Sequence, residues 1–363
     1  KAKCHREACY WALPPTPLND PPKESFGKGM TVEQSMASGM MEAIERYCGQ
    51  RFPHHEVINT TYEMVLNHAV NPSEFNLPTL PLKCENCTEA NTRCFQDLSK
   101  VSQEWSWGYS LTKEKPTLIP SSLVYYPYIS NDKTSFVFND TGGLSAGNTV
   151  EEAILQGIAE VIERDALYYC YNLGNLRNMP LLNFKDVRNR YVREFSEKLP
   201  SEAIFAIPLN NENVKLGVTT FSAFICYITN DERVYFGGSG TSLDPEVGLL
   251  RALTELEQQK VRQKTFVEFD RKDLLLQNDI RAEDTISIGN IGHQSTKDIK
   301  DDIELYLDAL AKHNMDVIVV NLTHPHIGMP VVRVIIPELI SYSGSVIKES
   351  VLFDVIRAYS KQK

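Results

Sequence analysis

Three segments of this chain share one pattern, in which a glycine-containing approach leads into a helix that carries acidic side chains on its inward-looking face. The segments span residues 25–47, 141–165 and 237–262. Apolar residues at helical spacing predict each helix, and the unequal distances between the segments do not fit a solenoid. The pattern predicts a core of related strand–turn–helix units with internal pseudo-symmetry.

Short strands alternate with these helices, which favours an α+β domain with mixed sheets. The first helix is predicted from Thr31, with Gln34 as capping partner, to Tyr47. The second and third are predicted over Val150–Tyr171, capped by Asn148 or Thr149, and Pro245–Lys264, and a fourth over Lys300–His313. Strands are predicted over Trp105–Tyr109, Leu118–Tyr128, 134–148, Leu216–Ile228, Val234–Gly238, Asp316–Asn321 and Val331–Ile336.

Composition divides the chain into one large domain and its flanks. A proline-rich stretch, residues 1–27, predicts an irregular arm, of which residues 1–25 lie outside the domain. Residues 26–340 form the domain, which includes a polar cysteine-containing loop over 71–104. Residues 341–363 form a C-terminal tail.

Charge and hydropathy narrow the class of protein. The net charge of −10 argues against a nucleic-acid or anionic-membrane partner, because a global basic field is absent. We find neither an apolar run long enough to span a bilayer nor a signal peptide, so a cytoplasmic location is expected. The eight cysteines are then expected to be mostly reduced.

The acidic helices carry stripes of one charge sign. Their small apolar flanks, their near lack of lysine and the repeated Glu-x-x-Glu-Arg pattern argue against ordinary solvated faces, which would hold Glu–Arg pairs. Clustered carboxylates repel each other unless a cation joins them, and Mg²⁺ prefers carboxylates together with substrate phosphates. The stripes are Glu42 with Glu45; Glu152, Gln156, Glu160 and Glu163; and Arg251, Glu255 and Gln258.

The glycine-rich turns fit a phosphate ligand. Thr141–Gly147 and Gly237–Thr241 allow close backbone approach before a helix N-terminus, which favours anions, although each turn alone is a weak signal. Lys28 lies between two glycines and is placed to meet a phosphate. No Walker A sequence or dinucleotide fingerprint is present, so ATP would bind through a different architecture.

From about Phe26 to Ile336, the motifs resemble those of the YcaO superfamily. A Gly-Lys-Gly at 27–29 precedes its first motif, and a Glu-x-x-Glu-Arg-Asp helix completes its second. The matching residues are Ser38, Glu42, Glu45 and Arg46; Ser145, Glu152, Gln156, Glu160, Glu163, Arg164 and Asp165; and the Arg-Ala-Leu-Thr-Glu run from Arg251 to Glu255.

The resemblance implies an α+β fold that holds ATP and Mg²⁺ in a concave site. Members phosphorylate a peptide backbone amide oxygen, and phosphate leaves when a nucleophile attacks the activated carbon. The carboxylates implied to hold Mg²⁺ are Glu42, Glu45, Glu152, Glu160, Glu163 and Glu255. The residues implied to contact ATP are Lys28, Ser38, Arg46, Ser145, Asn148, Gln156, Arg164 and Arg251.

Two features depart from the family pattern. Gln258-Gln259-Lys260 stands where members often carry Gln-Ser-Arg, with Arg262 nearby. The sequence ends in Ala358–Lys363 rather than in the proline-rich tail of many azoline-forming members. The second departure favours thioamide formation or a second subunit that completes the site.

The activity expected from the resemblance is a cyclodehydratase that forms azolines at Cys, Ser or Thr of a ribosomally made precursor peptide. The alternative within the superfamily is a thioamide synthetase that uses an external sulfide. A leader-binding or sulfur-delivery partner protein is expected in either case, and a homodimer is compatible with the chain length. Alternatives of other classes are a non-catalytic scaffold subunit, and a metal-carboxylate oxidase or hydrolase that works without ATP.

Cys84, Cys87 and Cys94 form a second candidate metal site. Three thiols in one polar loop suggest zinc, with a fourth ligand from Cys4, His5 or Cys9. The spacing matches no standard four-ligand set, so free cysteines are favoured.

Overall fold

The computed structural model describes the greater part of the expected domain. The described residues are 3–5, 8–12, 24–75, 102–128, 140–173, 180–197, 203–210, 219–229, 232–262, 268–269 and 285–340. Helices combine with antiparallel sheets and one parallel strand pair, which confirms the predicted α+β class with mixed sheets. No helix within these ranges has both the length and the apolar character needed to cross a membrane.

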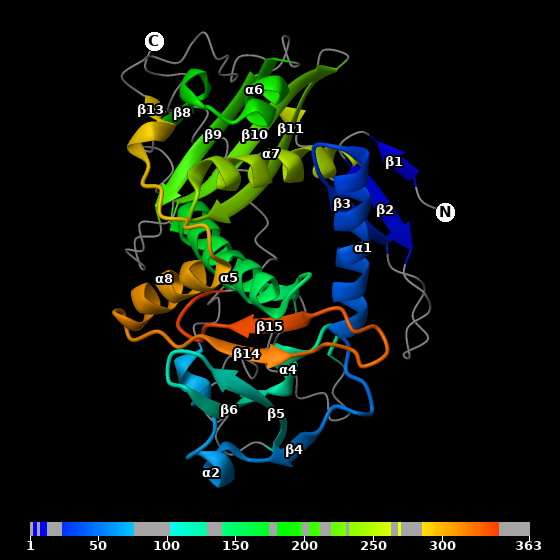
Figure 1. Ribbon diagram of the computed structural model, residues 1–363, viewed down its shortest axis with the longest axis vertical. Coiled ribbons are helices and arrows are strands. Elements are labelled where there is room, and N and C mark those ends of the chain that lie inside the picture. Colours follow the sequence, from blue (N-terminus) through cyan, green and yellow to red (C-terminus); the bar gives the residue numbers. More distant parts are fainter. Residues whose placement is uncertain are drawn as a thin grey trace.

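Two larger sheets lie at opposite ends of the molecule (Figure 1). One has the order β4-β5-β14-β15-β7, with β6 paired to β5, and the other has the order β12-β11-β10-β9. The strands of the first are β4 (Val57–Thr60), β5 (Gln103–Ser110), β6 (Lys115–Pro120), β7 (Leu144–Ala146), β14 (Ile318–Asn321) and β15 (Val331–Ile335). Those of the second are β9 (Ala203–Asn210), β10 (Thr219–Thr229), β11 (Glu232–Ser242) and β12 (Glu268–Phe269).

Smaller elements complete the frame. A three-stranded sheet is formed by β1 (Lys3–His5), β2 (Ala8–Ala12) and β3 (Glu24–Lys28), and a parallel pair by β8 (Leu181–Asn183) and β13 (Thr285–Ser287). The helices are α1 (Val32–Cys48), α2 (Tyr62–Val65), α4 (Ser121–Val124), α5 (Val150–Leu173), α6 (Arg190–Glu197), α7 (Pro245–Arg262) and α8 (Ile299–Ala311).

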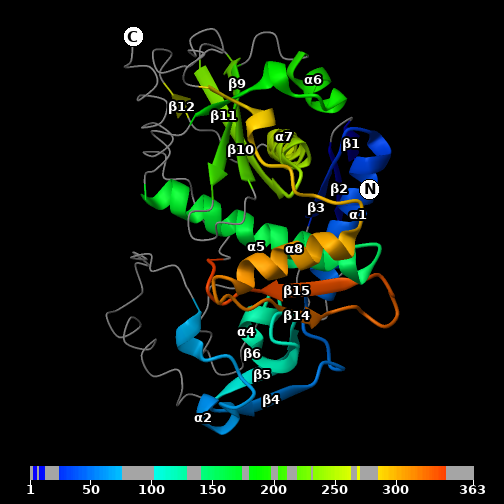
Figure 2. The ribbon, with the colours of Figure 1, turned by 60° about the vertical axis from the view of Figure 1, so that its left-hand side comes forward.

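Helix α5 lies between the two larger sheets in both views (Figures 1 and 2). On one side Ile158 and Ile162 of α5 pack with Val332 and Val334 of β15 in one apolar cluster. Helix α7 covers the other sheet, where Leu249, Leu253 and Leu256 pack against Phe221 of β10. Helix α5 is therefore held by apolar packing on β15 and by its contacts with β9, β10 and β11 of the other sheet.

The predicted helix starts are confirmed in atomic detail. Thr31 Oγ1 accepts a hydrogen bond from the backbone N–H of Gln34 at 3.2 Å, and Thr149 Oγ1 accepts one from Glu152 at 3.2 Å. Each bond satisfies a donor that the first helical turn leaves without a partner.

Two of the strand–turn–helix units share an unusually close packing. A Cβ at Gly27 of β3 would overlap the backbone of Ser35 and Gly39 in α1, and one at Gly238 of β11 would overlap the backbone of Ala252 in α7. Only glycine allows a strand to approach its helix this closely. The corresponding positions support the predicted relation between these units.

Several local predictions are wrong. Residues 1–27 are not irregular throughout, because β1 and β2 pair with each other and β2 pairs with β3. The strand predicted to reach Tyr128 ends at Pro120 and continues into α4, and the glycines of 237–241 lie within β11 rather than in a turn. Local sequence propensity predicted the wrong conformation in these segments, because pairing with neighbouring strands decided it. Residues 76–101, with the three loop cysteines, and the tail 341–363 lie outside the described residues.

Candidate active site

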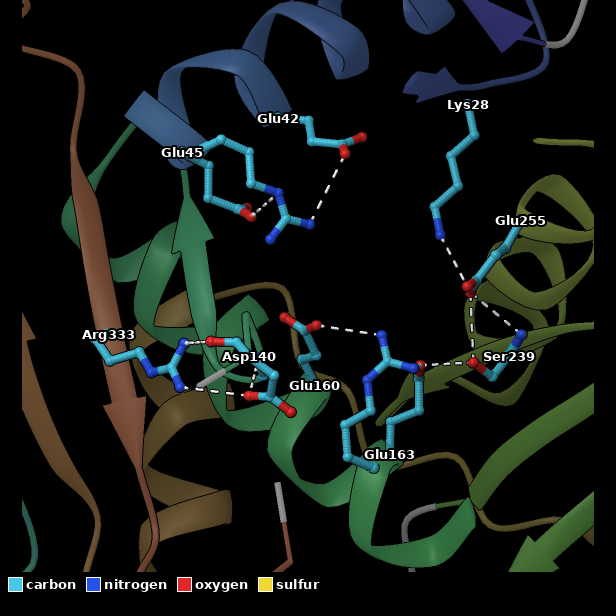
Figure 3. Close-up of polar contacts among 12 residues, drawn as sticks. Lys28, Glu42, Glu45, Asp140, Glu160, Glu163, Ser239, Glu255 and Arg333 are labelled. Atoms are coloured by element: carbon cyan, nitrogen blue, oxygen red, sulfur yellow. Dashed lines mark hydrogen bonds and ion pairs between the residues drawn. The ribbon is translucent and has the colours of Figure 1, made fainter. Parts of the chain in front are cut away.

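The acidic stripes of α1, α5 and α7 face one another. Figure 3 shows Glu42 and Glu45 from α1, Glu160 and Glu163 from α5, and Glu255 from α7 pointing into one region. The predicted residues come from three helices that are far apart in the sequence, and tertiary packing brings them together.

On α1, Arg46 lies between two carboxylates. Its guanidinium is 3.8 Å from Glu42 Oε1 and 3.9 Å from Glu45 Oε1, and Glu42 Oε2 accepts a hydrogen bond from the backbone N–H of Phe26 at 3.1 Å. Burial raises the pKa of Glu45 to about 8; Glu160 and Glu42 add to this effect, and Arg46 opposes it. An inward-facing Glu45 is therefore held only partly in its charged form.

On α5, Arg164 repeats this arrangement. Its Nη2 donates to Glu160 Oε1 at 3.3 Å, and its Nη1 lies 3.8 Å from Glu163 Oε1. Burial raises the pKa of Glu163, with Arg164 acting against it. The carboxylates around Arg164, above all Glu163, outweigh its own burial and raise its pKa, so this guanidinium is firmly charged.

Ser239 of β11 joins α5 to α7. Its hydroxyl donates to Glu163 Oε1 at 2.7 Å and lies 3.4 Å from Glu255 Oε2, which also accepts from the Ser239 backbone N–H at 3.2 Å. Lys28 Nζ reaches the same Glu255 oxygen at 3.5 Å. Burial opposes ionisation of Glu255, but Lys28 and Arg164 outweigh it and lower its pKa.

Strand β3 is attached to both flanking helices. The backbone N–H of Lys28 donates to Ser38 Oγ of α1 at 3.2 Å, and the Gln258 amide of α7 donates to the carbonyl oxygen of Phe26. The predicted phosphate-binding Lys28 therefore occupies a strand that α1 and α7 hold from two sides.

The remaining predicted residues make contacts of their own. Glu152 is engaged at the start of α5, where it accepts from the backbone and side-chain nitrogens of Asn148, both at 2.8 Å. Arg251 Nη1 donates to the Thr241 carbonyl at 3.1 Å, and Gln156 is half-buried on α5. Ser145 is fully buried in β7.

Several buried polar atoms of this region have no hydrogen-bond partner in the described part of the chain: Arg46 Nη1, Arg164 Nε and Ser145 Oγ. A buried donor without a partner is unfavourable by about 1–3 kcal/mol, which a polyanionic ligand would offset. Among the described residues no three His, Cys, Asp or Glu side chains stand close enough to form a metal site as they are. The carboxylates instead pair with cationic side chains, yet they outnumber them, so the donor set fits phosphate oxygens and a hard divalent cation.

Sequence reasoning missed three residues of this region, namely Ser239, Asp140 and Arg333. Arg333 Nη1 donates to the Asp140 carbonyl at 3.0 Å, and its Nη2 lies 3.6 Å from Asp140 Oδ1. The available signal is a single arginine within the apolar run of β15, a pattern that by itself predicts only a strand.

A family profile described as YcaO cyclodehydratase, ATP- and Mg²⁺-binding, matches residues 26–340. This chain belongs to the YcaO family. The predicted membership is confirmed, and ATP and Mg²⁺ are the ligands by which the family is described. The chain is also 30% identical over 357 residues to an uncharacterized protein of Methanothermobacter thermautotrophicus. This match covers 92% of this chain and 86% of the relative.

Solved YcaO-type structures share the fold. A YcaO protein of Methanopyrus kandleri bound with AMPPCP and Mg²⁺ matches with a TM-score of 0.67 and 22% identity, covering 96% of this chain and 87% of that one. The heterocyclase TruD matches with a TM-score of 0.70 and 25% identity, covering 87% and 47%. A heterocyclase in complex with substrate and cofactor matches with a TM-score of 0.73 and 24% identity, covering 87% and 45%. This chain therefore spans less than half the length of the two heterocyclase chains.

Proposed function

We propose that this YcaO protein uses ATP and Mg²⁺ to activate a backbone amide of a peptide by phosphorylating its oxygen. The observation that carries the proposal is the convergence of carboxylates from α1, α5 and α7 around buried guanidinium atoms of Arg46 and Arg164 that have no partner in the described chain. Surplus carboxylates next to unpartnered donors suit a phosphate chain with its metal better than they suit a peptide alone.

The basic and the acidic residues of the site have different proposed roles. Lys28, Arg46 and Arg164 are placed to contact phosphate oxygens. Bound Mg²⁺ would neutralise phosphate charge and orient the transferred group. The residues proposed to hold it are Glu42, Glu45, Glu152, Glu160, Glu163 and Glu255. Further nucleotide contacts are proposed for Ser38, Ser145, Asn148, Gln156 and Arg251.

The expected product is an azoline. A Cys, Ser or Thr side chain of the substrate attacks the activated amide carbon, and the former amide oxygen departs as part of the phosphate. The product therefore contains one water fewer than the peptide. Similarity to TruD supports this branch. Attack by an external sulfide on the same activated carbon would give a thioamide, in which sulfur replaces oxygen.

The first test is calorimetric titration of ATP, with and without Mg²⁺, into the wild type and Glu163→Gln. We expect tight binding only with Mg²⁺ and at least about tenfold weaker binding by the variant, because it loses a charged oxygen ligand. Glu151→Gln is the matched control, since Glu151 is an exposed acid on the same helix. Equal binding by all three proteins would contradict the assignment of Glu163, and no ATP binding by any of them would contradict the function.

The product is tested by mass spectrometry of a candidate precursor peptide. Loss of water that requires ATP identifies the azoline, and exchange of oxygen for sulfur that requires both ATP and sulfide identifies the thioamide. ATP binding without any turnover would favour a scaffold subunit, and turnover without ATP would favour a metal-carboxylate oxidase or hydrolase.

A further inference from the structure

Strand β15 contains one charged residue in an otherwise apolar sequence. All five of its residues are buried, and Arg333 is 4% exposed. Burial of a guanidinium is costly unless it is paired and hydrogen-bonded. A buried arginine at this position therefore requires a partner that offsets the cost of burial.

The partner is the turn that leads into β7. Besides the two Arg333 contacts, Asp140 Oδ1 accepts from the backbone N–H of Gly142 at 3.0 Å, and the Val334 N–H donates to the Gly143 carbonyl at 2.8 Å. Gly143 has a φ of +78°, a left-handed conformation that favours glycine. Side chain and backbone of β15 thus hold the 140–143 turn at both ends.

This turn adjoins the candidate nucleotide site. Leu144 and Ser145 follow it directly, and they pair in register with Arg333 and Val332. The Ser145 hydroxyl and Arg333 Nε are both buried without a partner among the described residues.

The acidic cluster also acts on Arg333. Besides Asp140, the carboxylates of Glu160 and Glu45 and the Arg46 guanidinium act electrostatically on Arg333. Figure 3 shows the Arg333–Asp140 pair beside Glu160. The pair therefore contributes to the local charge balance as well as to the geometry of the turn.

We propose that Arg333 is a positioning residue for nucleotide binding, which acts through Asp140 to hold the 140–143 turn and with it Ser145. This inference rests on the proposed ATP site. A purely structural ion pair would also stabilise the fold, but its loss would leave the ATP affinity of the folded protein unchanged.

The test replaces Arg333 by Met, which keeps an apolar stem and removes the charge, and Asp140 by Asn. We expect each variant to bind ATP with Mg²⁺ about tenfold to hundredfold more weakly at a temperature where it is folded, as when an orienting partner of a site is removed. The double variant should lose little more than either single variant, because both act through one contact. Arg333→Lys should recover part of the affinity.

A second measurement requires no ligand. Hydrogen exchange of the Gly142 amide should be faster in Arg333→Met than in the wild type, because Asp140 loses its anchor. The control is Asp316→Asn, which removes a buried carboxylate that pairs with Lys113 at 2.8 Å and accepts from Ser110 in the same sheet. This variant should lower stability while ATP affinity and Gly142 exchange stay at wild-type values.

The outcomes separate the two proposals. If the wild type binds ATP with Mg²⁺ and folded Arg333→Met and Arg333→Lys bind it equally well, the positioning role is wrong and the proposed function stands. If the wild type does not bind ATP, both fail.

Discussion

At the residue scale, Ser239 contacts two carboxylates whose pKa values move in opposite directions. The pKa of Glu163 is raised by burial, whereas that of Glu255 is lowered because Lys28 and Arg164 outweigh its burial. Both acids contact the same hydroxyl, at 2.7 Å and 3.4 Å, but their pKa values move apart because the Lys28 ammonium pairs with Glu255 at 3.5 Å. The placement of single charges therefore decides the direction in which the pKa of each acid in a buried cluster moves.

A histidine outside the acidic cluster allows a test of this reasoning by pH. Burial lowers the pKa of His55 to about 4, and His54 and His324 add to the effect. Its Nδ1 accepts from the backbone N–H of Phe52 at 3.2 Å, and its ring stacks on Tyr125 with centroids 5.1 Å apart. The imidazole of His55 is therefore neutral in the folded state.

We predict that the free energy of unfolding falls as the pH drops from about 6.5 to about 4, because the unfolded state binds a proton that the folded state excludes. The contribution of His55 should be intact above this window. Urea unfolding at a series of pH values measures this effect. In His55→Phe the free energy of unfolding should depend less steeply on pH than in the wild type, by up to about one proton. Exposed His313 serves as the control through His313→Gln, and an unchanged slope in His55→Phe would rule out this role.

At the element scale, α1 shows how packing can leave part of the apolar stripe of a helix at the surface. Val32, Met36 and Met40 lie at helical spacing but are 38%, 36% and 49% exposed. The buried side instead carries Ser35 and Gly39, because β3 lies directly against them. This close approach turns the acids of α1 toward the interior.

The same approach predicts the effect of a single methyl group at Gly238. Gly238→Ala should destabilise the protein by about 1–3 kcal/mol, because the added Cβ overlaps the Ala252 and Leu256 backbone and β11 must shift. The shift would also displace Ser239 from the acidic cluster, so ATP binding should weaken. Urea unfolding and calorimetry measure the two effects.

Gly289→Ala is the matched control, since a Cβ there meets only the Ser287 hydroxyl at 3.6 Å. Equal stability of the two variants would show that β11 and α7 have room to separate, contrary to the packing observed.

At the scale of the whole molecule, the candidate site depends on almost every layer. Strand β3, helix α1, the central α5, strand β11 and helix α7 each contribute a side chain to it, and α5 also packs on the opposite sheet (Figure 1). A ligand that contacts all of these elements would bind only the folded chain.

We therefore predict that ATP with Mg²⁺ raises the melting temperature of the whole chain in one transition. At a ligand concentration of 100 times the dissociation constant, the stabilisation should be about 2.7 kcal/mol. Differential scanning calorimetry measures it, with ATP alone and Glu163→Gln as controls. If the ligand raised the melting temperature of only one of two separate transitions, the layers would unfold independently and the ligand would bind only one of them.

The sequence by itself determined the local elements and the chemical character of the site. The 3.6-residue periodicity and the Thr31 cap predicted α1, and the repeated Glu-x-x-Glu-Arg motifs predicted which acids belong together, because both signals lie within one helix. Only the tertiary structure decided how these pieces meet. Ser239, Asp140 and Arg333 stand outside every acidic stripe, so their roles depend on contacts between strands and helices that no local spacing encodes. The exposed apolar residues of α1 have the same cause, since the depth of a helix face depends on which strand packs against it.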